Sequence, residues 1–154
     1  MSTEYDAAIA KIIRSSLEEF GANKPGTVYY DKETDHLTRL FDHPRAYYFM
    51  ALHEGRLLGG AGIFPTAGLE ENMAELVKMY LLPEARGIGL GKKLLEACFE
   101  KAREMGYTTL YIETLPELRQ AISLYRHMGF EEIPAQLGNS NHGGCSVFMV
   151  RTIT

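Results

Sequence analysis

Apolar residues recur every three or four positions near the start of the chain, from about Asp6 to Phe20, and Gly21 follows them. This spacing places the apolar side chains on one face of a helix, and glycine is a common residue just past a helix end. The next stretch, to Asp31, is rich in turn-forming residues, and residues 34–41 show a weaker helical pattern that ends at His43-Pro44. We therefore predict one amphipathic helix and a less regular segment before position 45.

The pattern changes to that of strands after position 45. Two runs rich in aromatic and apolar residues, 46–52 and 57–64, flank the short polar segment 53–56, and this arrangement predicts a hairpin. A third strand is predicted over 73–82. Strict alternation would put four residues on one of its faces, Glu75, Val77, Met79 and Leu81, and three on the other, Leu76, Lys78 and Tyr80.

Strands and helices then alternate. A glycine-rich turn after Pro83 leads into a predicted helix over 90–105, and the strand predicted over 108–113 would return parallel to the third strand. Residues 114–117, Thr-Leu-Pro-Glu, have the spacing of an N-terminal capping box for a helix that reaches Met128. Two further strands are predicted over 130–133 and 145–152. The elements together indicate an α/β fold with a mixed, mostly antiparallel sheet.

Composition supports one ordinary domain over residues 1–154. The chain is 45% apolar and 23% charged, and its formal net charge of −4 argues against nucleic-acid binding through a cationic face. No apolar run approaches the ~20 residues that span a bilayer, and the first residues lack the apolar core of a secretory signal. Cys98 and Cys145 form no Cys-x-x-Cys pair, which is typical of a reduced compartment. We expect a cytoplasmic protein with no membrane partner.

The turn from Arg86 to Gly91 is the candidate binding feature. Alternate glycines let backbone N–H groups face one concavity, and the following helix contributes the positive end of its dipole, so phosphate oxygens are natural ligands. A tightly packed turn without a ligand is equally compatible with this pattern. Arg86 stands where a P-loop needs its first glycine, and Lys92 stands where a dinucleotide-binding turn needs its third. Both nucleotide motifs are therefore excluded.

Two segments resemble motifs of one family. Residues 82–91, Leu-Pro-Glu-Ala-Arg-Gly-Ile-Gly-Leu-Gly, are similar to the pyrophosphate-binding motif of the GNAT superfamily of acyl-CoA-dependent N-acyltransferases, written Arg/Gln-x-x-Gly-x-Gly/Ala. Residues 121–130, Ala-Ile-Ser-Leu-Tyr-Arg-His-Met-Gly-Phe, resemble its second signature, with a tyrosine four residues before Gly-Phe. The resemblance implies a GNAT-like mixed sheet with one parallel strand pair, flanked by about four helices.

The resemblance also implies a cofactor, acetyl-CoA, and positions that bind it. The backbone of the third strand would pair with the pantetheine amides at Met79, Tyr80 and Leu81. The pyrophosphate would lie on the turn that Arg86 opens, at Gly87, Ile88, Gly89, Leu90, Gly91 and Lys92. Tyr125 stands where the family often has a hydroxyl that protonates the departing thiolate. An asparagine that the family often has seven residues earlier is here Leu118, so its hydrogen bond to CoA is absent.

The acceptor amine must lose a proton before it attacks, so a base is useful. Glu75 stands where some family members carry a glutamate base, and its apolar neighbours on the strand would raise its pKa. Glu113, at the end of the next strand, is the competing candidate, since other members use a glutamate there. Either carboxylate could instead form an ion pair.

The remaining candidate groups indicate little further chemistry. The five histidines lack metal-ligand spacing, so no metal is expected, although the loop that carries His142 could border the acceptor cleft. Cys145 has no base nearby in the sequence and is interpreted as an inert thiol.

The function implied by the resemblance is direct transfer of an acetyl group from acetyl-CoA to a primary amine of a small molecule. Acetylation of protein or peptide N-termini is an alternative within the same enzyme class, and a non-catalytic acyl-CoA-binding module is an alternative outside it. The apolar strands near Tyr47 and at the end of the chain could supply the edge of a homodimer.

Overall fold

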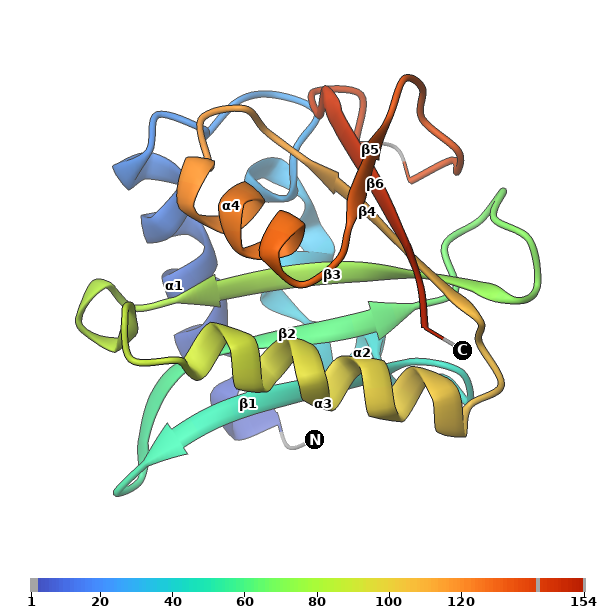
Figure 1. Cartoon of the computed structure of the whole chain (residues 1–154). Coiled ribbons are helices and arrows are strands. Elements are labelled where there is room, and N and C mark those ends of the chain that lie inside the picture. The colour runs from blue at the N-terminus through green and yellow to red at the C-terminus, as the bar shows by residue number, and fades with distance from the viewer. Residues whose placement is uncertain (1–2, 141, 154) are drawn as a thin grey trace.

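The computed structural model describes residues 3–140 and 142–153, which form one six-stranded sheet flanked by helices (Figure 1). The strands are β1 (Tyr47–His53), β2 (Arg56–Phe64), β3 (Met73–Leu81), β4 (Thr109–Thr114), β5 (Glu131–Ile133) and β6 (Val147–Thr152). The helices are α1 (Asp6–Glu19), α2 (Leu37–Leu40), α3 (Leu90–Glu104) and α4 (Arg119–His127). Among the described residues, no helix has the length and apolar character needed to cross a bilayer.

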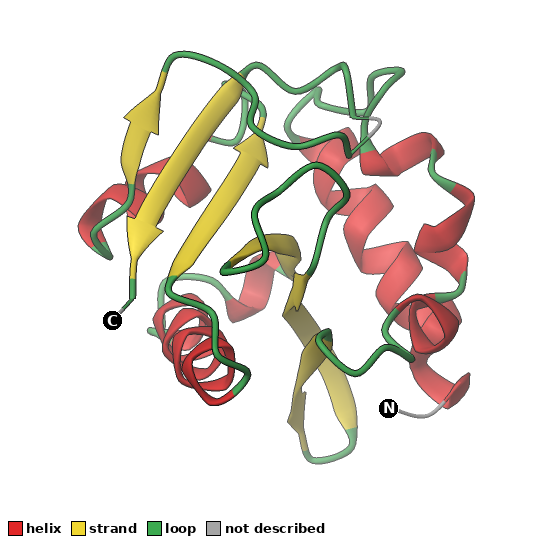
Figure 2. Cartoon of the chain, turned by 90° about the vertical axis from the view of Figure 1, so that its right-hand side faces the viewer, coloured by secondary structure: helices red, strands yellow, loops and turns green. Residues whose placement is uncertain are grey.

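The strand order is β1-β2-β3-β4-β6-β5, and only β3 and β4 run parallel to each other. The prediction of a mixed, mostly antiparallel sheet with one parallel pair and four helices is therefore confirmed. Figure 2 shows helices on both sides of the strands. One core lies between the sheet and helices α3 and α4, and it includes Leu95, Phe99 and Tyr125. The other lies under α1 and α2 and includes Ile13, Leu17 and Leu37.

Strands β3 and β4 diverge after a short contact. They pair only where Met73–Glu75 meets Thr109–Tyr111, whereas β3 continues along β2 as far as Leu81 and β4 continues along β6 as far as Thr114. Figure 1 shows the two strands separating toward the left. The backbone edge of β3 over 76–81 therefore faces an opening in the sheet. Its groups without a strand partner are available to an extended ligand, apart from the carbonyls of Lys78 and Leu81, which accept from Tyr48 and Arg86.

A β-bulge at Lys78 lies beside this opening. Lys78 has a φ of +52°, and the pairing of β3 with β2 shifts register between Gly60 and Gly62. The bulge moves each following side chain to the face opposite the one that strict alternation predicts. Met79 and Leu81 pack with Leu76 on the α3 side, while Tyr80 packs with Val77 on the α1 side. The prediction that Glu75, Val77, Met79 and Leu81 share one face is wrong for this reason.

Tyr48 supports the bulge from the neighbouring side of the sheet. Its hydroxyl donates to the Lys78 carbonyl at 2.8 Å. Its ring lies against two glycines of β2, since a Cβ on Gly60 or Gly62 would come within 2.5 or 2.6 Å of ring atoms. The glycines of β2 therefore make room for a tyrosine that anchors the irregular backbone of β3.

The predicted capping box at residues 114–117 is wrong. Thr114 is the last residue of β4, paired with Val147, and α4 begins only at Arg119, without a side-chain cap. The carbonyl of Thr114 accepts from the N–H of Ser146 at 3.2 Å, so the sheet holds this threonine. The helical pattern of 34–41 shortens for a similar reason, because the Thr34 hydroxyl donates to the carbonyl of Val28 at 2.7 Å and stabilises a 3-10 turn instead.

We predict that Tyr48→Phe lowers the free energy of unfolding by about 1–3 kcal/mol, because the buried Lys78 carbonyl loses its donor. Urea unfolding should show a lower midpoint with an unchanged slope. Tyr30→Phe is the matched control, since Tyr30 is 61% exposed and its hydroxyl has no hydrogen bond in the described part of the chain. A Tyr48→Phe variant as stable as this control would contradict the support role.

Candidate active site

A cavity of about 590 Å³ occupies the opening between β3 and β4. Its walls include β3 from Glu75 to Leu81, β4 and the residues after it from Ile112 to Leu115, and residues of α1 and α4. The glycine-rich turn borders the cavity near the end of β3. Val28 comes from a 3-10 turn after α1, and His142 and Cys145 come from the loop before β6. The structure thus brings the sequence-predicted residues of β3, β4, α4 and the turn to one site, except Ile88 and Leu90, which do not line the cavity.

The turn has the geometry of an anion site. Gly87 and Gly89 have φ values of +78° and +84°, which favour glycine, and Gly89 directly precedes α3. A Cβ on either residue would meet no atom within 4 Å, so the space beside the backbone is open. The first N–H groups of a helix have no intrahelical partners and attract negative charge. The turn can therefore hold a phosphate group.

Arg86 has a different place from the rest of the turn. Its guanidinium donates to the Leu81 carbonyl at 2.9 and 3.2 Å and pairs with Glu19 of α1 at 2.7 Å. The guanidinium also lies 5.0 Å from the ring centroid of Phe20. Arg86 thus fastens the end of β3 to α1, and its charge is already partnered by a carboxylate.

Tyr125 reaches the cavity from α4. The side chain is buried, and its ring packs edge-to-face with Phe130 at 5.9 Å between centroids. Burial raises the pKa of the phenol above its ordinary value, so the hydroxyl keeps its proton. This hydroxyl has no hydrogen-bond partner within the described residues, which leaves it free to donate to a ligand.

Glu75 is a buried carboxyl on β3, only 3% exposed. Burial raises its pKa from the ordinary 4.5 to about 7, and the nearby charge of Glu113 acts in the same direction. A hydrogen bond from the Thr66 hydroxyl to Oε1, at 2.6 Å, partly opposes the shift. A carboxyl that titrates near neutral pH can both accept and release a proton.

Glu113 has more partners than Glu75. Its Oε2 accepts from the Tyr111 hydroxyl at 2.8 Å and from Gln136 Nε2 at 3.0 Å, and its Oε1 accepts from the Ser140 hydroxyl. These contacts tie the loop after β5 to the end of β4. The arrangement favours Glu75 over Glu113 as a proton acceptor, because the lone pairs of Glu113 are largely occupied by the loop.

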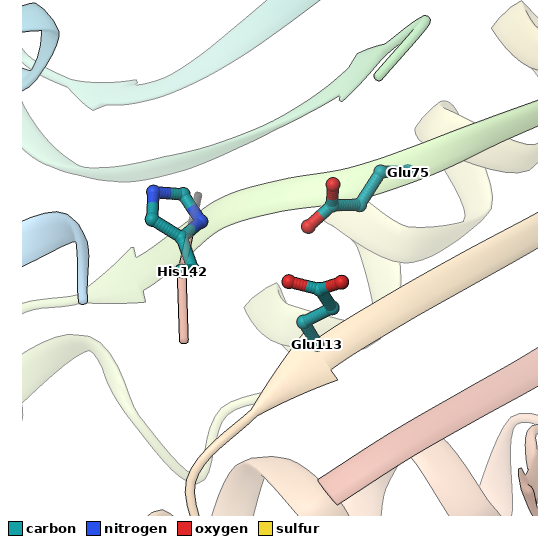
Figure 3. A group of neighbouring side chains, drawn as sticks. All are labelled: Glu75, Glu113 and His142. Atoms are coloured by element: carbon teal, nitrogen blue, oxygen red, sulfur yellow. The ribbon is translucent and has the colours of Figure 1, made fainter. Parts of the chain in front are cut away.

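His142 joins the two carboxylates at the cavity wall (Figure 3). One ligand atom from each of Glu75, Glu113 and His142 lies within 4.8 Å of the others. Sequence spacing did not show this cluster, because its members come from two strands and a distant loop. Three such groups could ligate a divalent cation, and Glu75, which accepts one hydrogen bond, has more free lone pairs for it than Glu113, which accepts three.

Cys145 and Lys78 also line the cavity. Burial raises the pKa of the Cys145 thiol to about 12, so the thiol stays protonated, which agrees with an inert cysteine. Lys78 was not a candidate at the sequence level, yet it is one of the residues that line the cavity, and only 7% of it is exposed. The available signal was a lone lysine within an otherwise apolar strand segment.

Comparisons with known proteins agree with this architecture. Residues 9–130 match the family described as Acetyltransferase (GNAT) family. The chain is 42% identical to YjgM of Escherichia coli (strain K12), which is described as an uncharacterized N-acetyltransferase, over 99% of this chain and 92% of that protein.

Solved structures show the same fold. A GNAT-family acetyltransferase from Staphylococcus aureus superposes with a TM-score of 0.85 at 20% identity, covering 100% of this chain and 96% of the other. The PaiA N-acetyltransferase from Thermoplasma acidophilum, solved in complex with coenzyme A, has a TM-score of 0.75 at 18% identity, with 99% and 95% covered.

The pKa of Glu75 predicts how stability changes with pH. Between pH 4.5 and 7 the unfolded chain releases the Glu75 proton while the folded chain retains it, so this group makes folding less favourable as the pH rises. Glutamine cannot ionise. We expect Glu75→Gln to gain stability relative to the wild type across this range, by up to about 3 kcal/mol, and the difference to level off above it.

Urea unfolding at several pH values measures this difference. Glu131→Gln, at an exposed position of β5, is the control and should show no comparable trend. A Glu75→Gln stability difference that stays constant between pH 4.5 and 7 would be evidence against the raised pKa.

Proposed function

Because this chain belongs to the GNAT family of acetyltransferases, we propose that it transfers the acetyl group of acetyl-CoA directly to a primary amine of a small molecule. The chain is an N-acetyltransferase by family, and the proposal concerns its donor site, its acceptor and its catalytic residues. The observation that carries the proposal is the buried Glu75, with a pKa of about 7, in a cavity between two diverging strands.

The donor would lie along the opening of the sheet. The free edge of β3 at Met79, Tyr80 and Leu81 offers backbone groups to the pantetheine amides, as an added strand would. The turn from Gly87 to Lys92 would hold the pyrophosphate through backbone N–H groups at the start of α3. Arg86 would act indirectly, by fixing the end of β3 against α1.

Glu75 would accept the proton of the acceptor amine. At neutral pH a lysine-like amine costs about 4.6 kcal/mol to deprotonate and an α-amine about 1 kcal/mol. A carboxyl with a pKa of about 7 is still substantially ionised at neutral pH. Its carboxylate also binds a proton more tightly than an ordinary glutamate does. Glu113 would hold the loop after β5 at this end of the cavity, through Gln136 and Ser140.

The thioester would react between the bulge and α4. A backbone N–H of β3 near Leu81 would stabilise the oxyanion that forms when the amine attacks. Tyr125 would then donate to the departing CoA thiolate. Full proton transfer from an ordinary phenol to such a thiolate is uphill by about 2 kcal/mol, so a hydrogen bond to the developing charge is sufficient for this role.

The loops around the acceptor end support a small acceptor. The N–H of Gly144 donates to the Gly26 carbonyl at 3.0 Å, and the N–H of Asn139 donates to the Ala67 carbonyl at 2.7 Å. These contacts join three loops that are far apart in the sequence. Two of these loops line the cavity, at Thr27 and at His142, and loops joined in this way favour a small amine over a protein N-terminus, which is the alternative acceptor.

We predict that Glu75→Gln lowers kcat/KM for acetyl transfer by about 10²-fold near neutral pH, in the range typical of a lost general base. Only the ionised carboxylate accepts a proton, so wild-type activity should rise with pH with an inflection near 7. Glu75→Gln should lack this inflection and rise only as the acceptor amine itself deprotonates. The measurement is release of CoA thiol from acetyl-CoA with a panel of small amines and peptides.

Glu113→Gln is the matched comparison and should retain the inflection near pH 7. Loss of the inflection near pH 7 in Glu113→Gln but not in Glu75→Gln would show that Glu113, and not Glu75, is the proton acceptor. Turnover of peptides but not of small amines would show that the acceptor is a peptide N-terminus and not a small molecule. Binding of acetyl-CoA without thiol release from any amine would indicate a non-catalytic acyl-CoA-binding module.

A further inference from the structure

Lys78 is a buried cation that the proposed chemistry does not use. It lies at the bulge of β3, three residues after Glu75, and it is one of the residues that line the same cavity. Only 7% of the residue is exposed. Three residues of chain span at most about 10 Å, so the Lys78 and Glu75 backbones lie within the length of a small molecule.

The ammonium of Lys78 has no direct partner in the described part of the chain. The structure shows no hydrogen bond from Nζ and no carboxylate oxygen within 4.0 Å of it, although an ammonium offers three donors. Burial lowers the pKa of Lys78, and the charges of Asp31, Glu75 and Glu33 act against that shift from a distance. Because the residue is largely buried and no described group pairs with its charge, a counter-ion supplied by a ligand would be favourable.

The neighbouring carboxylates have other partners. Asp31 accepts from the N–H of Glu33 at 3.0 Å, and its other oxygen lies 3.4 Å from His142 Nε2. Glu75 accepts from Thr66. These contacts orient both groups, so neither forms the ion pair that a buried lysine normally has.

The position of Lys78 separates it from the phosphate-binding turn. The acidic groups that act on its charge belong to the segment after α1 and to β3 itself, whereas the turn follows the far end of β3 at Gly87. His142, from the loop before β6, partners Asp31 on the same side of the cavity. A negative group that meets Lys78 would therefore belong to the acceptor and not to the pyrophosphate of CoA.

We propose that Lys78 binds a carboxylate carried by the acceptor, so that the acceptors of this enzyme are amino acids or similar small molecules with an amine and a carboxylate a few bonds apart. This inference rests on the proposed function, because Glu75 receives the amine end. The ammonium of Lys78 would then bind the carboxylate end of a zwitterionic acceptor, and the carboxylate of Glu75 would bind its amine end. Lys78 is a specificity-determining residue in this arrangement.

Matched acceptors test the inference. Each pair is an amino acid and its α-carboxamide, assayed by thiol release at saturating acetyl-CoA. For at least one pair, we expect kcat/KM to be ten-fold or more higher for the acid, mainly through KM. Lys78→Met should bring the two members to within about three-fold of each other, Lys78→Arg should retain the preference, and the exposed Lys11→Met should behave as wild type.

A binding measurement covers the case in which no amine in the panel is turned over. Calorimetry on the CoA-loaded protein compares N-acetyl amino acids with N-acetyl amino amides, which are the products of the same pairs. Tighter binding of a carboxylate product, lost in Lys78→Met, supports the inference without any catalysis. Loss of CoA binding itself would instead contradict the proposed donor site.

Three results would overturn the inference. One is thiol release that proceeds equally well with acids and amides in the wild type, which would leave acetyl transfer intact and remove only the carboxylate site. Another is failure of every carboxylate product to bind better than its amide. The last is intact-mass evidence that acetyl-CoA acetylates Lys78, since an acetylated lysine carries no charge for a carboxylate.

Discussion

The divergence of β3 from β4 is the feature on which the rest of the site depends. Two parallel strands that paired along their full length would leave no free backbone edge and no cavity between them. Pairing stops after Glu75, and the bulge at Lys78, held by the Tyr48 hydroxyl, reorients the remainder of β3. Arg86 then fixes the strand end to α1. Specific contacts at the bulge and at the end of β3 thus maintain the opening.

The same opening gives two nearby glutamates different properties. Glu75 lies on the inner strand with one hydroxyl partner, and burial dominates its pKa. Glu113 lies where β4 meets the loop after β5, and three donors occupy its oxygens. We therefore propose different roles for two residues of the same type, because their surroundings differ. Glu75 accepts a proton, and Glu113 anchors the loop. Lys78 adds a positive charge to the cavity wall that holds these carboxylates, and His142 lines the same wall.

Much of this could be predicted from the sequence, because periodicity and two local motifs determine the elements and the phosphate turn. The sheet with its single parallel pair and the helices after Gly89 and before Gly129 followed from such local signals. Alternation along β3 failed because the bulge depends on Tyr48, a residue thirty positions away. The capping box at Thr114 failed because the sheet competes for that residue. The Glu75–Glu113–His142 cluster and the unpartnered Lys78 arise from tertiary contacts, which no local pattern encodes.

Hydrogen–deuterium exchange with and without CoA tests the central claim most directly, since the claim is that the cofactor pairs with the free edge of β3 and with the turn before α3. We expect CoA to slow exchange of amides in two segments, residues 79–81 and 87–92, and Gly89→Val to weaken this protection, because a β-branched residue disfavours the left-handed backbone at that position. Protection confined to other segments, or equal protection in Gly89→Val, would contradict the account.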